Sequence, residues 1–81
     1  MMAHLTSAWQ AGGSRNVSAG WRLQFHYDED VIAALKANIP ATDREWHDAD
    51  ADDPEKWWWV DRVHEDKIAK LFPNFEGYLR Q

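Results

Sequence analysis

The chain has 81 residues, a formal net charge of −5 and no cysteine. This length accommodates one small domain and excludes a second domain or a fold that encloses a large cofactor. Without cysteine there are no disulfides, thiolate zinc sites or thiol chemistry, which favours a reducing, cytoplasmic location. The longest apolar runs, Val31–Leu35 and Trp57–Val60, fall far short of the roughly 20 residues of a spanning helix, so we expect no membrane association.

Six tryptophans and an uneven distribution of charge are the main features of the composition. Residues 48–61 contain six carboxylates and one lysine, and the rest of the chain is neutral. Nucleic-acid binders usually carry an overall excess of basic residues. The charge therefore counts against a nucleic-acid partner. The amino terminus has no basic segment followed by an apolar stretch, so we also expect no secretory signal.

Residues 1–20 combine alanine, glycine and serine with isolated apolar residues at Leu5, Trp9 and Val17. Neither the period of a strand nor that of a helix is sustained there. The segment is therefore predicted to be a flexible leader, and residues 21–81 are predicted to form the compact domain.

The first predicted element is a strand that begins near Gly20. Apolar residues alternate there with polar ones, at Trp21, Leu23, Phe25 and Tyr27. The next three residues, 28–30, are all acidic and favour a helix start, because carboxylates there meet unpaired amides and the positive end of the helix dipole. The helix is predicted to span about Glu29–Ala37 and to stop before Pro40.

Two short strands joined by a polar turn are predicted next. The first lies within Ala41–His47, with Trp46 as its one large apolar residue, and the second is Trp57–Val60. Asp61 then caps a second helix, which Pro73 ends. The apolar positions of this helix recur at helical spacing, at His64, Ile68, Leu71 and Phe72.

These elements predict an α+β fold in a single small domain of order β-α-β-β-α. We expect a three-stranded antiparallel-type sheet with two helices on one face. The predicted core draws on every element: Leu23, Phe25, Val31, Ile32, Leu35, Trp46, Trp58, Val60, Ile68, Leu71 and Phe72.

A series of short motifs runs from Trp21 to about Phe75. It comprises a strand ending in an aromatic residue and Asp, a Val-Ile-Ala-Ala-Leu-Lys helix, an Ile-Pro, a Trp-x-Asp, a Lys-x-Trp-x-Val strand and an Ile-Ala-Lys-Leu-Phe helix. This series resembles the small HARP-type module of annealing helicases and its short bacterial and phage relatives. The resemblance implies a compact β-α-β-β-α fold and contact with forked or single-stranded DNA.

The same resemblance places Trp58 and Val60 inward. Since neighbouring residues of a strand face opposite sides, Trp57 and Trp59 then lie on the other face, with the polar residues of the first strand. Exposed aromatic rings beside a cation can stack nucleic-acid bases. The candidate binding residues are therefore Arg22, His26, Trp57 and Trp59. Two alternatives remain: the ends of the chain cover this face, or it is buried in a homodimer.

The hairpin turn carries an acidic loop that includes Asp48, Asp50, Asp52 and Asp53. The first three have the spacing of a calcium-binding EF-hand loop, but the required glycine is Asp53 and the required glutamate is Trp59. We therefore predict a solvated tip, which repels nucleic acid, attracts a basic partner or holds a cation loosely. The four histidines show no metal-binding spacing, so we expect no metal site and no cofactor.

The sequence contains no recognisable catalytic triad and no phosphate-binding glycine loop, so an enzyme is not expected. We predict a small binding module that contacts single-stranded or forked DNA through the aromatic and arginine face. The alternative is a protein-interaction factor, of a phage or mobile-element type, that uses the same face or the acidic loop. Charge favours the second function, and the resemblance favours the first.

Overall fold

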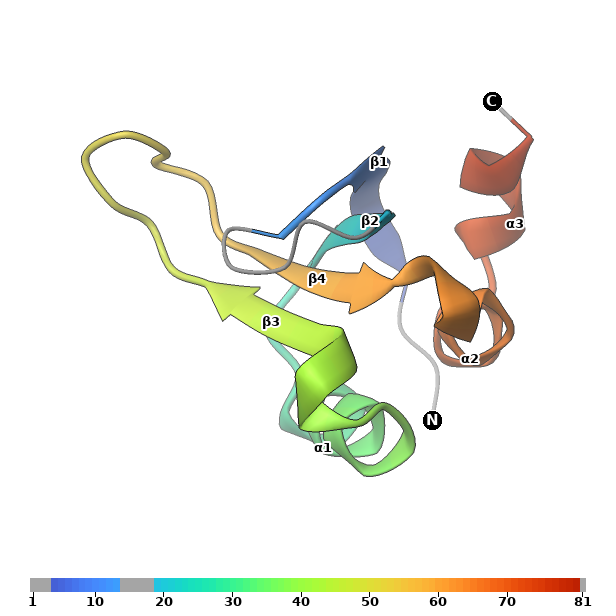
Figure 1. Ribbon diagram of the computed structural model, residues 1–81. Helices are drawn as coiled ribbons and strands as arrows, with labels where there is room; N and C mark the ends of the chain where they lie inside the picture. The colour runs from blue at the N-terminus through green and yellow to red at the C-terminus, as the bar shows by residue number, and fades with distance from the viewer. Residues whose placement is uncertain (1–3, 14–18, 81) are drawn as a thin grey trace.

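The computed structural model describes residues 4–13 and 19–80, which form a four-stranded sheet with helices packed on one face (Figure 1). The elements are β1 (Leu5–Ala11), β2 (Gly20–Phe25), α1 (Glu29–Asn38), the 3-10 turn η1 (Ala41–Asp43), β3 (Arg44–His47), β4 (Trp57–Asp61), the 3-10 turn η2 (Arg62–His64), α2 (Glu65–Leu71) and α3 (Phe75–Leu79). The strand order is β1-β2-β4-β3, and every neighbouring pair is antiparallel. The predicted α+β class and antiparallel sheet are confirmed.

The described residues hold one strand and one α-helix more than the sequence predicts. The flexible leader predicted for residues 1–20 does not extend over Leu5–Ala11, because this segment pairs with β2 as β1. Its pattern hides the strand: the pairing shifts between Leu5 and Ser7, so the buried residues Leu5 and Ala8 are three positions apart instead of two. Residues 1–3 and 14–18, also assigned to the leader, lie outside the described residues.

The core lies between the sheet and the helices. Of the predicted core residues, Leu23, Val31, Leu35, Trp58, Val60, Ile68 and Phe72 are buried, and Phe25, Ile32 and Leu71 pack partly buried against them. Trp46 differs from the prediction, since 46% of it is exposed on the edge strand β3. The core also includes Trp21 and Phe75, whose rings meet edge to face with centroids 5.0 Å apart.

Helix α1 is fixed at both ends by polar contacts. The Asp28 side chain accepts hydrogen bonds from the backbone N–H groups of Asp30 and Val31, at 3.0 and 3.3 Å, as the sequence predicts for this start. At the other end Lys67 of α2 donates to the Asn38 carbonyl at 2.8 Å. A lysine there satisfies a carbonyl that the helix leaves unpaired. The first contact caps the start of α1, and the second joins its end to α2.

Long-range hydrogen bonds join the carboxyl-terminal part to the sheet. The Asn74 carboxamide accepts from the Leu5 backbone N–H and donates to the Leu5 carbonyl, both at 2.9 Å. The indole N–H of Trp21 donates to Glu65 Oε2 at 2.6 Å.

No helix of the described segments has the length and apolar character needed to cross a membrane.

Candidate functional site

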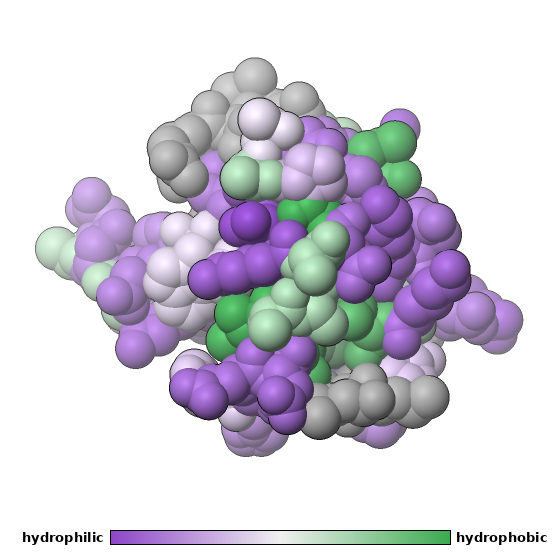
Figure 2. Space-filling model, turned by 90° about the horizontal axis from the view of Figure 1, so that it is seen from below, coloured by the Kyte–Doolittle hydropathy of each residue, from purple (hydrophilic) through white to green (hydrophobic). Residues whose placement is uncertain are grey.

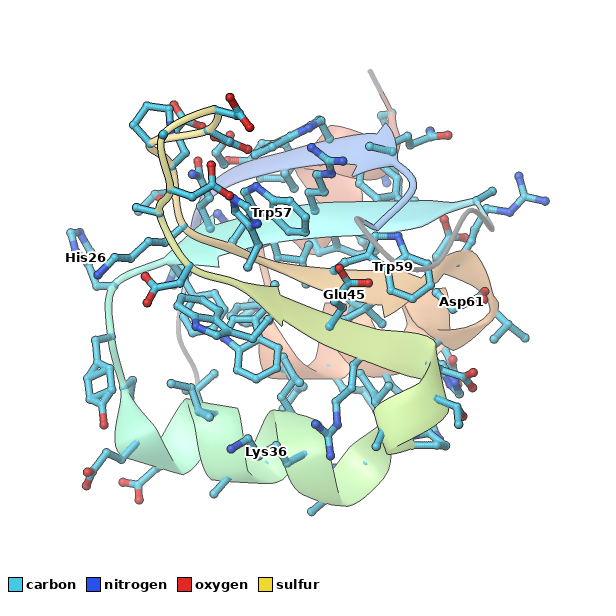
Figure 3. The ribbon with its side chains drawn as sticks, turned by 60° about the vertical axis from the view of Figure 1, so that its left-hand side comes forward. His26, Lys36, Glu45, Trp57, Trp59 and Asp61 are labelled. Atoms are coloured by element: carbon cyan, nitrogen blue, oxygen red, sulfur yellow. The ribbon has the colours of Figure 1, made fainter. Side chains whose placement is uncertain are left out.

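The two faces of β4 carry different sets of tryptophans, as the sequence predicts. Trp58 stands opposite Leu23 of β2 and belongs to the core, together with Val60. Trp57 and Trp59 lie on the opposite face, where Trp59 stands across from Arg22. Figure 3 shows both indoles on the side of the sheet away from Lys36, which projects from α1.

Trp59 is covered by the chain itself, with only 1% of its surface exposed. Its indole N–H donates to the Ala11 carbonyl at 3.0 Å. A Cβ atom at Gly13 would collide with the Glu45 carboxylate and lie 3.3 Å from Cδ2 of this ring, and one at Gly20 would collide with its indole nitrogen. Glycine at both positions therefore lets the backbone approach the ring closely. This matches the alternative in which the amino-terminal segment covers the face.

Trp57 is 2% exposed and is held by side chains from the strands on either side of β4. The Arg22 guanidinium of β2 lies 4.2 Å from the ring centroid. The His47 ring of β3 stacks at 4.4 Å with an interplanar angle of 15°. Arg22 also donates from Nε to the Gly12 carbonyl at 2.9 Å.

The four candidate DNA-binding residues therefore divide into two groups. The structure brings Arg22, Trp57 and Trp59 together, but both indoles are engaged within the chain. His26 is exposed and points outward from the end of β2, away from both indoles (Figure 3). A base can stack on either indole only after these internal contacts open.

The acidic loop, residues 48–56, projects beyond the sheet between β3 and β4 (Figure 1) and forms the hydrophilic projection at the left of Figure 2. Two of its aspartates build the turn. Asp50 Oδ1 accepts from the backbone N–H groups of Asp52 and Asp53 at 2.9 and 2.7 Å, and Asp53 Oδ1 accepts from that of Glu55 at 3.0 Å. Asp48 and Asp52 are exposed.

Asp53 connects the loop to the sheet. The indole N–H of Trp57 donates to Asp53 Oδ2 at 3.1 Å, and this bond is the largest cause that holds the pKa of the Asp53 carboxyl below its usual value. The Glu55 backbone N–H and the charges of His47 and Arg22 lower this pKa further. The loop is thus attached at its Trp57 end.

His47 lies close to two loop carboxylates without a hydrogen bond to either. Its Nε2 is 3.5 Å from Asp53 Oδ2 and 4.0 Å from Asp50 Oδ2. This nitrogen is buried and has no hydrogen-bond partner in the described part of the chain. The ranges 4–13 and 19–80 contain no cluster of three or more histidine, aspartate or glutamate side chains that could hold a metal ion.

A groove of about 270 Å³ opens at the end of the sheet where β2 leads into α1, and Trp57 lines it together with residues of the helix-facing side. Its apolar floor consists of Leu23, Phe25, Ile32 and Trp58. Tyr27 and Trp46 stand at its rim, 74% and 46% exposed. Trp46 leans on Trp58, with ring centroids 5.3 Å apart. The sequence analysis did not predict this groove, because it placed Trp46 in the core. The weak strand propensity of Ala41–His47 was the one indication that this strand lies at the edge of the sheet.

Acidic segments flank the groove on two sides. Residues 28–30 at the start of α1 and 48–55 in the loop together hold eight carboxylates. Two lysines lie among them. Lys56 pairs with Asp48 at 3.7 Å, and the Lys36 ammonium lies 6.0 Å from the centroid of the Trp58 ring. Lys56 is the one charged side chain among the described residues that line the groove, and the carboxylates lie in the chain segments on either side of it.

No protein-family model, curated protein or solved structure matches the chain. The resemblance to the HARP-type module therefore stays a prediction. On the surface of the chain the groove and the acidic loop are neighbours, since Lys56 of the loop lines the groove.

Proposed function

We propose that this chain is a non-enzymatic protein-interaction module that binds a basic segment of a partner protein and packs one apolar side chain of that segment against Trp46 at the rim of the groove. The observation that carries this proposal is an open apolar groove with eight carboxylates in the two segments that flank it. The apolar surface specifies one property of the partner, and the flanking carboxylates specify another.

The apolar half specifies an anchor side chain. Pockets for drug-sized ligands usually measure about 300–1,000 Å³ and enclose most of the ligand, so an open groove below that range suits one or two side chains. Burying a leucine or phenylalanine side chain contributes about 1.5–3 kcal/mol. Trp46 and Tyr27 supply the exposed aromatic surface at the rim that such an anchor covers.

The charged half specifies lysine or arginine beside the anchor. Carboxylates on both sides of a groove attract cations and repel phosphates, so they favour a basic peptide over DNA. The internal contacts of Trp57 and Trp59 support the same choice, because they occupy the rings proposed for base stacking. Contact with single-stranded or forked DNA is therefore the competing outcome of the test.

The test is a display selection of random peptides on the wild-type protein and on Trp46→Ala. Val63→Ala is the matched control, since Val63 is an exposed apolar residue of η2 outside the groove. We expect wild type and the control to enrich peptides with one apolar residue between lysines or arginines, and Trp46→Ala to lose them. Failure to enrich such peptides, or tight binding of a single-stranded oligonucleotide that Trp46→Ala leaves unchanged, contradicts the proposal.

A further inference from the structure

We infer that the partner segment binds in extended form, as a fifth strand beside β3, and places its apolar side chain next to Trp46. This inference rests on the proposed function and adds the binding mode. The strand order β1-β2-β4-β3 leaves β3 with a strand on one side only. An edge strand directs the amides and carbonyls of alternate residues outward, and an extended peptide can pair with them.

The two edges of the sheet differ in a way that favours β3. At β1 the Asn74 carboxamide bonds both the N–H and the carbonyl of Leu5, as a residue of a neighbouring strand would. Residues of α3 pack beside β1 as well. No described element lies beyond β3 in the sheet order, and β3 forms the front edge above α1 in Figure 3.

The side chains across the sheet specify the anchor. Ala8, Leu23, Trp58 and Trp46 stand opposite one another in a row across the four strands, on the helix-facing side. The first three are buried, and only Trp46, at the open end, is half exposed. In a fifth strand the residue opposite Trp46 would have its Cβ about 4.5–5.5 Å from that of Trp46. An apolar residue there extends the row and covers the exposed ring.

The continuation of β3 specifies the flanking charge. Asp48 follows Trp46 by two positions and is exposed. Residues two apart share a face in an extended chain and lie about 6.5–7 Å apart. A lysine or arginine two positions from the anchor on the Asp48 side therefore meets Asp48, which also pairs with Lys56 at 3.7 Å, whereas the residue two positions from Trp46 on the other side is Arg44. The partner segment therefore has a lysine or arginine, one intervening residue and then the apolar anchor. The cation can precede or follow the anchor in the partner's sequence.

The experiment uses the acetylated peptide amide Thr-Lys-Thr-Leu-Thr-Lys-Thr, which places a lysine two positions from the leucine on both sides. Its affinity is measured by calorimetry, beside two versions that are N-methylated at alternate backbone amides. One version carries methyl groups on the leucine and both lysines, and the other on the threonines. Since methylation removes the donor, we expect about a tenfold or greater loss for one version and little change for the other.

The outcomes separate the two proposals. Equal effects of the two methylation patterns, or failure of this peptide to bind while selected basic peptides bind, overturns strand addition and leaves the proposed function standing. A selection that enriches no basic peptide overturns both. Slower amide exchange at alternate residues of Arg44–His47 in the complex is expected from strand addition.

Discussion

The indole N–H of Trp57 donates to Asp53 Oδ2 at 3.1 Å, and this hydrogen bond joins the acidic loop to the buried side chains on the outer face of the sheet. Arg22 and His47 stack on the same indole. The loop that supplies most of the negative charge beside the groove is therefore positioned by Trp57. Trp57 thus has a structural role in the proposed function.

Replacing Asp53 tests this attachment. Asp53→Ala removes the acceptor for Trp57 Nε1 and for the Glu55 backbone N–H, so we expect a lower melting temperature. Asp53→Asn keeps a neutral acceptor and should lower it less. Asp52→Ala is the matched control, since Asp52 is exposed at the loop tip and its loss should leave the melting temperature nearly unchanged. Equal effects of the two alanine variants would mean that the loop is not attached at Asp53.

The lowered pKa of Asp53 predicts a pH dependence of stability with a definite sign. The Trp57 bond lowers this pKa below 3.8, so the folded state binds the proton more weakly than the unfolded state does. The stabilisation is complete above the unfolded pKa and is lost as the pH falls through the folded pKa. Thermal melts of wild type and Asp53→Asn should therefore converge as the pH is lowered from 5 to below 3. A difference that grows toward acid pH would contradict this assignment.

Trp58 on β4 is buried and its neighbour Trp46 on β3 is half exposed, so replacing each should lower the free energy of unfolding by a different amount. Trp58→Ala removes a core side chain and should cost about 3–5 kcal/mol, enough to unfold much of a domain this small. Trp46→Ala removes a half-exposed side chain and should cost markedly less. Urea denaturation followed by circular dichroism measures both. Comparable losses would place Trp46 in the core, as the sequence predicts.

Replacing Gly20, with Gly77 as the matched control, tests how closely the backbone approaches Trp59. Gly20→Ala places a Cβ against the Trp59 indole nitrogen and 2.6 Å from the Val60 carbonyl oxygen, so we expect strong destabilisation. Gly77→Ala lies in α3 with no atom within 4 Å of the new Cβ, so it should stabilise the protein by about 0.5–1 kcal/mol through helix propensity. Thermal unfolding of both variants decides the point, and a neutral Gly20→Ala would refute the tight packing over Trp59.

Local patterns predict part of this structure. The acidic cap at Asp28 and the helix after it follow from patterns over a few residues, the HARP-type resemblance implies the inward side of β4, and the structure contains each of these features. What covers Trp57 and Trp59 depends on contacts with Ala11, Gly12 and Asp53, and no pattern around β4 specifies these partners.

Two other features depend on long-range pairing. β1 is recognised only through its pairing with β2, because the shift between Leu5 and Ser7 breaks its alternation. The exposure of Trp46 depends on β3 being the last strand of the sheet. Strand order is set by pairing between distant segments, and local patterns do not specify it. The groove was not predicted because it depends on β3 being an edge strand.

The most direct test of the proposed function is the indole N–H region of a nitrogen-15 correlation spectrum, in which each tryptophan gives its own signal. The peptide Thr-Lys-Thr-Leu-Thr-Lys-Thr should shift the signal of Trp46 most, because this ring lines the groove and is half exposed. A single-stranded oligonucleotide should leave the signals of Trp57 and Trp59 unchanged, because both rings are buried and bonded within the chain. An oligonucleotide that shifts Trp57 and Trp59, together with a peptide that leaves Trp46 in place, would contradict the proposal and favour DNA binding.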